Sequence, residues 1–293
     1  MTFSSSECIT WLALFITISI TIVTVNLLSI VLFITNRSLR TRAMYLVINL
    51  TIADMFVGGF SSLYLLLLLE CDIWEIHLTL GLTIIIEFLC IWFPLTSLTN
   101  IAVISLERMH ATIRPFRHRL IKKWVYGVTI AGVWVLATMV NAMFIITTRY
   151  RQYLIYGLYA WQSYCCLCLL VICVSYFSIV VKFLCGAHPQ HHGAANRQRK
   201  LTVTLFIMTI VSLLMWLPFT VYCFHLSQSS IRKFLSFQEL KRLDCFLTIL
   251  FYMNSLVNPI VYTIRIPEFR KALLLLFKRQ RRQNARDIPL HAL

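Results

Sequence analysis

Residues 244–264 read DCFLTILFYMNSLVNPIVYTI, a mainly apolar stretch without Lys or Arg. A helix needs about 20 mainly apolar residues to cross a lipid bilayer, so this stretch predicts a membrane-spanning helix. Asn254, Ser255 and Asn258 fall at spacings of one and four residues, which places their side chains on one face of that helix. Pro259 follows directly, and proline removes a backbone hydrogen bond. The stretch therefore predicts a transmembrane helix with a polar face and a kink.

Six further apolar runs of similar length precede this one. They cover residues 11–34, 43–69, 78–106, 124–147, 154–184 and 202–226. Of the 293 residues, 59% are apolar and only 13% are charged, whereas a soluble domain has about 25% charged residues. The expected fold class is therefore an all-α membrane protein with seven transmembrane helices, and the composition argues against a soluble enzyme.

The basic residues indicate which ends of the runs face the cytoplasm. Most of the 27 Lys and Arg lie between runs one and two, three and four, or five and six, or after run seven. Short cytoplasmic loops are rich in Lys and Arg, so we expect these segments inside the cell and the N-terminus outside. The net charge of +16 then belongs to a membrane face, and we expect a multi-pass plasma membrane protein that binds lipids but no nucleic acid.

Gly and Pro are scarce, with 8 and 7 residues, so no flexible linker divides the chain. We expect an extracellular N-terminus over residues 1–10, a transmembrane domain over 11–266 and a cytoplasmic segment over 267–293. In the last segment, apolar residues recur at helical spacing from Phe269 to Phe277 between basic side chains. This pattern predicts a short amphipathic helix on the inner membrane surface.

Asp54 lies in the middle of the second run, where an ionisable side chain costs about 2.5–3.5 kcal/mol to insert. Ser97 and the polar face of residues 254–258 are expected at a similar depth in their own runs. A carboxylate with hydroxyl and amide oxygens suits a small hard cation such as Na⁺. A hydrogen-bonded network that only holds helices together is an equal alternative from spacing alone. We expect no other cofactor, and no nucleophile–base pair indicates an enzyme.

The third run ends in Leu106-Glu107-Arg108-Met109-His110, and helical spacing places Arg108 on the same face as Ser97, Cys90 and Glu87. The sixth run contains Trp216-Leu217-Pro218, whose proline is expected to kink that helix. Such kinks can act as pivots between two packings of a helix bundle.

Together these residues resemble the rhodopsin-like (class A) G protein-coupled receptors across essentially the whole chain. Each predicted span carries one landmark of that family, and the amphipathic segment carries another. The landmarks are Asn26, Asn49-Leu50-x-x-Ala53-Asp54, Glu107-Arg108-Met109, Trp134, Tyr176, Trp216-x-Pro218, Asn258-Pro259-x-x-Tyr262 and Phe269. Each motif alone is weak, but the whole series in order is specific.

The resemblance implies a receptor that binds an extracellular ligand and activates a heterotrimeric G protein on the cytoplasmic side. It favours a sodium pocket over the purely structural network, formed by Asp54, Ser97, Asn254, Ser255 and Asn258. It also implies a set of coupling and switch residues, of which the arginine faces the G protein on activation. These residues are Glu107, Arg108, Tyr176, Pro218, Pro259 and Tyr262.

By the same resemblance, the ligand pocket lies in the outer half of the bundle. Its expected lining is Glu87, Cys90, Ile91, Trp161, Trp216, Phe219, Tyr222 and Tyr252. Cys90 stands where aminergic receptors have Asp, which disfavours a monoamine, and Tyr252 stands where opsins have the retinal-binding Lys. Glu87 and Asp244 could receive a cationic group, while the aromatic lining suits a lipid or a peptide side chain.

Three positions depart from the family pattern. Thr83 replaces the usual bridging cysteine, Cys168 replaces the proline of the fifth span, and Ser212 replaces the phenylalanine below the tryptophan of the sixth span. The first two departures are similar to the branch of melanocortin, cannabinoid and lysophospholipid receptors.

The outer face keeps three cysteines, Cys8, Cys71 and Cys245, in an oxidising compartment. We expect Cys8 or Cys71 to pair with Cys245. At the inner face, the family often restrains the arginine with a second acid at a position that holds Gln198 here, which favours ligand-independent signalling.

Two other functions fit parts of the sequence. A seven-helix ion channel or transporter would carry ions past Asp54, but it would need further charged residues along a path through the membrane. A binding receptor that does not signal would fit Met109 and Ser212, which differ from the family pattern.

Overall fold

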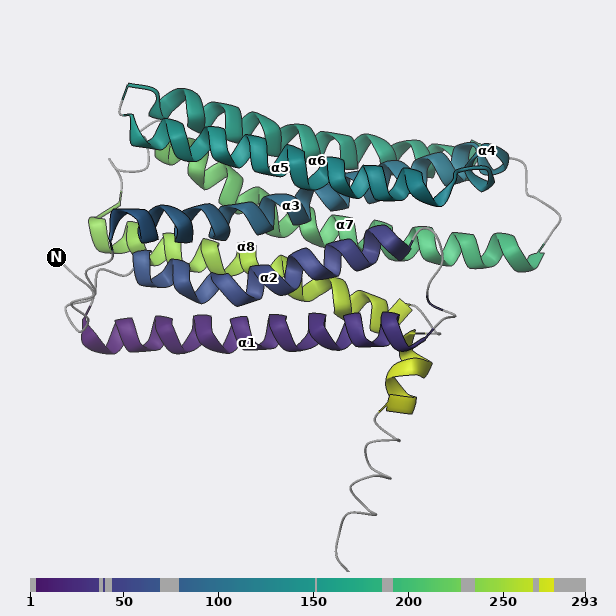
Figure 1. The fold of residues 1–293 in the computed structure, drawn as a ribbon, viewed down its shortest axis with the longest axis horizontal. Helices are drawn as coiled ribbons and strands as arrows, with labels where there is room; N and C mark the ends of the chain where they lie inside the picture. Colours follow the sequence, from purple (N-terminus) through teal and green to yellow (C-terminus); the bar gives the residue numbers. More distant parts are fainter. Residues whose placement is uncertain are drawn as a thin grey trace, which may run out of the picture.

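A computed structural model describes residues 4–36, 39, 44–68, 79–150, 152–185, 192–227, 235–265 and 269–276. Within these residues every regular element is a helix, and the long helices lie side by side in one bundle (Figure 1). The helices are α1 (Ser5–Thr35), α2 (Met44–Leu68), α3 (Leu80–Ile113), α4 (Pro115–Arg119), α5 (Lys123–Arg149), α6 (Leu154–Cys185), α7 (His192–Ser227) and α8 (Phe237–Arg265). Residues 269–276 form one further short helix.

The seven long helices correspond to the seven apolar runs, so the predicted all-α fold is confirmed. Six of the described helices are long and apolar enough to cross a membrane, and α7 contains the shorter apolar segment Ile210–Phe224. The extra helix α4 begins at Pro115, directly after α3 ends. Proline suits the first position of a helix, where its missing N–H has no partner to lose.

The first helix begins earlier than the predicted boundary between residues 10 and 11. The Ser4 hydroxyl accepts the backbone N–H of Glu7 at 3.3 Å, and the Glu7 carboxylate accepts the backbone N–H of Ser4 at 3.3 Å. This reciprocal pair satisfies two backbone donors that a helix start leaves free. Part of the predicted N-terminal segment is therefore helical.

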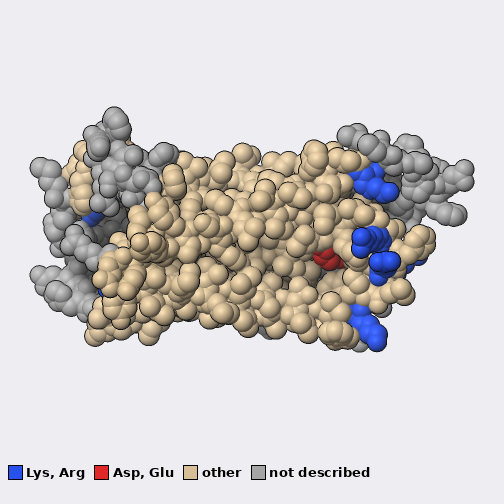
Figure 2. All heavy atoms as spheres, turned by 90° about the horizontal axis from the view of Figure 1, so that it is seen from above, with Lys and Arg blue, Asp and Glu red and all other residues tan. Residues whose placement is uncertain are grey.

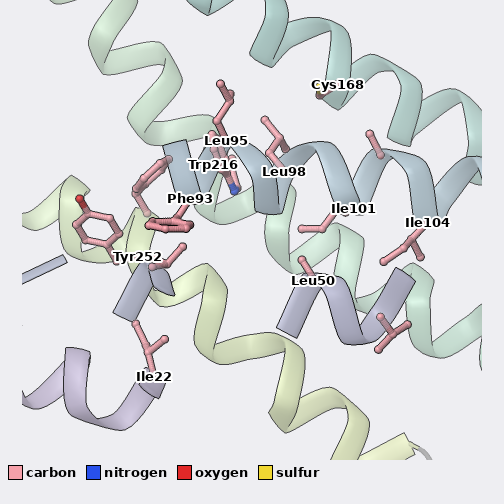
Figure 3. Close-up of a cluster of buried hydrophobic side chains, with 14 of the residues drawn as sticks. Ile22, Leu50, Phe93, Leu95, Leu98, Ile101, Ile104, Cys168, Trp216 and Tyr252 are labelled. Atoms are coloured by element: carbon pink, nitrogen blue, oxygen red, sulfur yellow. The ribbon is translucent and has the colours of Figure 1, made fainter. Parts of the chain in front are cut away.

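The core of the bundle is built from close contacts between helices (Figure 3). Leu50 of α2, Leu98 of α3 and Trp216 of α7 are almost completely buried. Gly58 lets α1 approach α2 closely, because a Cβ there would lie 2.7 Å from Cγ2 of Ile22. Lipid tails are as apolar as these side chains, so dense packing rather than removal from water holds the helices together.

Basic side chains and the short helix of residues 269–276 lie at one end of the bundle. In Figure 2 the Lys and Arg side chains gather at the end that carries α4. Near the end of α1, Phe269 is buried against Phe33, with ring centroids 5.6 Å apart. Leu274 and Leu275 on the same short helix are exposed, as is Lys271. This arrangement supports the predicted amphipathic helix at this end.

Candidate functional site

Asp54 of α2 lies at the centre of a polar cluster that joins three helices. Its Oδ1 accepts hydrogen bonds from the hydroxyls of Ser97 on α3 at 2.7 Å and Ser255 on α8 at 2.8 Å. Its Oδ2 accepts a hydrogen bond from Nδ2 of Asn258 at 2.6 Å. All four side chains are buried. The structure thus brings together four of the five residues predicted for a sodium pocket.

The fifth residue, Asn254, is buried one turn before Asn258 on α8. The Oδ1 atoms of both amides have no hydrogen-bond partner in the described part of the chain. Buried polar atoms nearly always have a partner, so these two carbonyl oxygens have capacity for a further ligand. Together with the Asp54 carboxylate, these oxygens are a donor set that fits a small hard cation.

A second buried network joins α2, α3 and α5. Nδ2 of Asn49 donates to Oδ1 of Asn100 at 2.7 Å, and Oδ1 of Asn49 accepts the indole N–H of Trp134 at 2.9 Å. Asn49 and Trp134 appear in the sequence only as family landmarks, and Asn100 appears only as a polar residue within an apolar run. The network could not be predicted from spacing, because its members lie on three separate helices.

The second half of α7 packs against α8 through aromatic rings. Trp216 and Phe219 of α7 both contact Phe251 of α8, with ring centroids 4.5 Å and 4.6 Å apart. Tyr252 packs against Phe251 at 5.4 Å and against Phe15 of α1 at 6.5 Å. Three predicted pocket residues therefore meet around Phe251, which the sequence analysis did not select.

Glu87, a predicted partner for a cationic ligand group, already has a cationic partner in the protein. It forms an ion pair with Arg149, the last residue of α5. Both side chains are about one-third exposed, so the pair lies near the surface of this end of the bundle. Of the other predicted pocket residues, Ile91 is partly buried against the core and Tyr222 is buried.

Cys90 and Trp161, two further predicted pocket residues, contact neighbouring helices. The thiol of Cys90 donates to the backbone oxygen of Phe60 on α2 at 3.2 Å. Trp161 of α6 packs against Phe144 of α5, with ring centroids 5.9 Å apart. The aromatic cluster of α7 and α8 is thus the part of the predicted pocket whose members are brought together, through their shared neighbour Phe251.

At the other end of the bundle, Arg108 of α3 is buried and held by its neighbour. Its Nε–H donates to Oε2 of Glu107 at 2.5 Å. The other oxygen, Oε1, lies 2.7 Å from Nε2 of His118 on α4 and 3.4 Å from the hydroxyl of Tyr126 on α5. One carboxylate therefore connects the arginine to α4 and α5. The roles of His118 and Tyr126 could not be predicted from the sequence, because no periodic spacing relates residues on separate helices.

The remaining predicted switch residues lie on the last three long helices. Tyr176 of α6 is buried and packs against Phe206 of α7, with ring centroids 5.4 Å apart. Helices α7 and α8 continue through Pro218 and Pro259. The side chain of Tyr262 lies outside the described part of the structure.

Residues 25–262, most of the chain, match the family model for 7 transmembrane receptors of the rhodopsin family. The chain belongs to the rhodopsin family. The fold of this receptor agrees with the crystal structure of squid rhodopsin at a TM-score of 0.77, with 17% identity over 95% of this chain and 87% of that chain.

Curated relatives span most of the receptor. It is 24% identical over 307 residues to the substance-K receptor of Homo sapiens, covering 92% of this chain and 72% of the relative. It is 26% identical over 278 residues to trace amine-associated receptor 5 of Homo sapiens, covering 82% and 76% respectively. These relatives do not belong to the melanocortin, cannabinoid and lysophospholipid branch, so that placement stays a prediction.

Membership of the rhodopsin family determines the class of function. The receptor binds an extracellular ligand and signals through a heterotrimeric G protein, and it is a multi-pass plasma membrane protein rather than an enzyme. Neither an ion channel or transporter nor a receptor that only binds is favoured by these relatives.

The predicted disulfide bond to Cys245 is not found in the structure. Cys8 is disulfide-bonded, but Cys245 is a free thiol, so the predicted pairing with Cys245 is wrong. Cys245 is completely buried in the packed core, where a thiol behaves as a small apolar side chain. The third candidate, Cys71, lies outside the described residues.

Proposed function

We propose that this receptor recognises an extracellular peptide at the aromatic cluster of α7 and α8 and signals to a G protein at the end that carries α4. Two observations support a peptide over a lipid. The tachykinin receptors among the relatives are named for substance K and tachykinin-like peptides. The cluster of Trp216, Phe219 and Phe251 offers aromatic surface that an apolar peptide side chain can contact.

The proposed orientation places the N-terminus outside the cell. Its support is the concentration of Lys and Arg at the α4 end, since basic residues favour the cytoplasmic side. The aromatic cluster then lies toward the extracellular side of the bundle, and Arg108 lies at the cytoplasmic end of α3.

We also propose that Na⁺ binds at Asp54. Asp54, Ser97, Ser255 and Asn258 would hold the ion through oxygen atoms, with Asn254 adding a further carbonyl nearby. A bound cation supplies a positive charge that offsets the buried carboxylate. Because the four residues come from α2, α3 and α8, the cluster ties these helices together in one packing.

The proposed signal-transfer step is the release of Arg108 from Glu107. In this structure the guanidinium of Arg108 is buried and forms an ion pair with the carboxylate of Glu107. Release would let the arginine face the G protein, as the family resemblance implies, with Tyr176 and Tyr262 as its new partners. Movement at Trp216 would reach this end through α7 and its internal proline, Pro218.

The deciding experiment is a panel of G protein biosensors in cells that express the receptor, challenged with a peptide collection that includes substance K and, in parallel, with collections of lipids and of amines. We expect at least one peptide to raise the signal in wild type and to lose its effect in Arg108→Ala at equal surface expression. Cells without the receptor are the control. If only lipids or only amines activate the wild type, the peptide assignment is wrong.

A further inference from the structure

We propose that Asp244, near the start of α8, receives the cationic group of the ligand. The aromatic residues further along the same face would hold the apolar group attached to that cation. This inference rests on the proposed function, because it takes the start of α8 to face the outside of the cell. It differs from the sequence-based expectation, which divided that role between Asp244 and Glu87.

Among the described acidic residues, Asp244 is the one to which the described part of the chain offers no partner. It forms no hydrogen bond or ion pair within the described part of the chain, and its side chain is half-buried. Every other described Asp or Glu has a partner: Glu7 pairs with Arg242, Asp54 with Ser97, Glu87 with Arg149, Glu107 with Arg108 and Glu239 with Ser236. A half-buried carboxylate without a partner is costly, and a ligand cation would remove that cost.

A second unsatisfied group lies one turn below Asp244. Thr248 follows at a spacing of four residues, so the two side chains share one face of α8. Thr248 is only 2% exposed, and its Oγ1 has no hydrogen-bond partner in the described residues. Phe251 continues the same face at a spacing of three residues further. The face therefore presents a carboxylate, then a free hydroxyl, then an aromatic ring.

This face is directed toward α7. Phe251 contacts Trp216 and Phe219 of α7, and Asp244 is close enough to interact electrostatically with the thiol of Cys223, one turn beyond Phe219. Cys223 and Phe219 are partly exposed, whereas Trp216 is buried. The acidic end of this face is thus partly exposed, and its other end is packed among aromatic rings.

The arrangement selects a ligand by chemistry. An ammonium or guanidinium donates to carboxylate and hydroxyl oxygens, and an aromatic group on the same ligand can stack on the rings further along the face. The ligand class is therefore a cation joined by a short link to an aromatic group. A free arylalkylamine carries this pair of groups, and so does a peptide with a basic residue beside an aromatic one.

The test uses Cys223 as a reporter in the full-length receptor in membranes. The thiol is modified with methanethiosulfonate reagents that carry either a trimethylammonium or a sulfonate group, and peptide mass mapping measures the rate at Cys223. A unit charge close enough to interact electrostatically changes each rate a few-fold in opposite directions, so Asp244→Asn should lower the cation-to-anion rate ratio by roughly an order of magnitude.

Glu239→Gln is the matched control for this ratio. It removes one charge from the same helix but keeps a side chain that can cap the helix start, where Glu239 bonds to Ser236. The ratio should stay near the wild-type value in this variant. An unchanged ratio in Asp244→Asn, an equal fall in Glu239→Gln or a Cys223 thiol that reacts with neither reagent would overturn the proposal.

Protection of the same thiol distinguishes the possible ligand sources. 2-Phenylethylamine represents free amines, the dipeptide Arg-Phe amide represents peptides, and neutral 2-phenylethanol is the control. At least one cationic probe should slow modification of Cys223 in wild type but not in Asp244→Asn, and the alcohol should slow neither. Equal protection by the alcohol, or protection by none of the three, counts against the cation site.

These measurements need no G protein, so they fail independently of the proposed function. If no peptide activates the biosensors but Asp244 still controls the rates at Cys223, the cation site stands and the peptide assignment does not. If a peptide activates the receptor but the modification rates at Cys223 are the same in wild type and Asp244→Asn, the cation site is wrong and the proposed function stands.

Discussion

Nε2 of His118 lies 2.7 Å from Oε1 of Glu107, whose other oxygen holds Arg108 at 2.5 Å. The short helix α4 therefore braces the carboxylate that restrains the arginine. Because Glu107 is mostly buried, its position depends on these few hydrogen bonds and on the more distant hydroxyl of Tyr126. The restraint on Arg108 is thus shared among α3, α4 and α5.

Removing the brace should raise ligand-independent signalling. A partly buried hydrogen bond contributes about 0.5–1.5 kcal/mol, so His118→Ala should increase a minor active population by about two- to tenfold. His118→Gln keeps a donor near the position of Nε2 and should signal like wild type. The measurement is basal G protein activation per receptor at the cell surface, with Arg108→Ala as the background. Equal basal activity in the Ala and Gln variants would show that the bond to Glu107 has no restraining role.

Adding an acid at the end of the sixth span should have the opposite effect. Gln198 lies among Arg197, Arg199 and Lys200, and its side chain lies outside the described part of the structure. Gln198→Glu supplies a second carboxylate for Arg108, and a partly exposed ion pair contributes roughly 0–1 kcal/mol. Basal signalling should therefore fall by up to about fivefold. Gln198→Leu, which is similar in size and uncharged, should not lower it. Basal activity at background in wild type would refute the idea of a missing restraint.

Sodium should stabilise the receptor through Asp54. A ligand that binds only the folded state stabilises it by RT ln(1 + [L]/Kd), which is about 1.4 kcal/mol at ten times Kd. The thermal stability of purified receptor should rise when Na⁺ replaces K⁺ at constant ionic strength, and Asp54→Asn should abolish the rise. Ser19→Ala removes a buried hydroxyl that bonds to Ser61 at 2.6 Å, away from the site, and should keep the rise. A sodium effect that persists in Asp54→Asn would exclude this site.

The bond between Trp134 and Asn49 should stabilise the bundle. Trp134→Phe keeps an aromatic ring but leaves Oδ1 of Asn49 buried without its donor. Polar contacts between membrane helices contribute about 0.6–1.7 kcal/mol, so the free energy of unfolding should fall by that amount. Trp124→Phe, at a position that is 64% exposed, should change it little. A double-mutant cycle with Asn49→Ala isolates the bond, and strictly additive effects would show that it contributes nothing.

Much of the architecture could be predicted from the sequence by itself. Every backbone polar group must be satisfied within a lipid bilayer, so an apolar run of about 20 residues has essentially one structure available, a helix. Seven such runs with their landmarks therefore determined the fold and the family. The polar residues around Asp54 could be predicted too, because a buried charge at mid-membrane depth needs partners at the same depth.

Contacts between helices were decided only by the tertiary structure. Periodicity gives the face of a helix on which a side chain lies, but not the rotation and height of that helix relative to its neighbours. These two quantities follow from packing among all seven spans at once. For this reason the sequence did not reveal that Glu87 is paired with Arg149, that Glu107 is braced by His118, or that Cys245 is enclosed in the core.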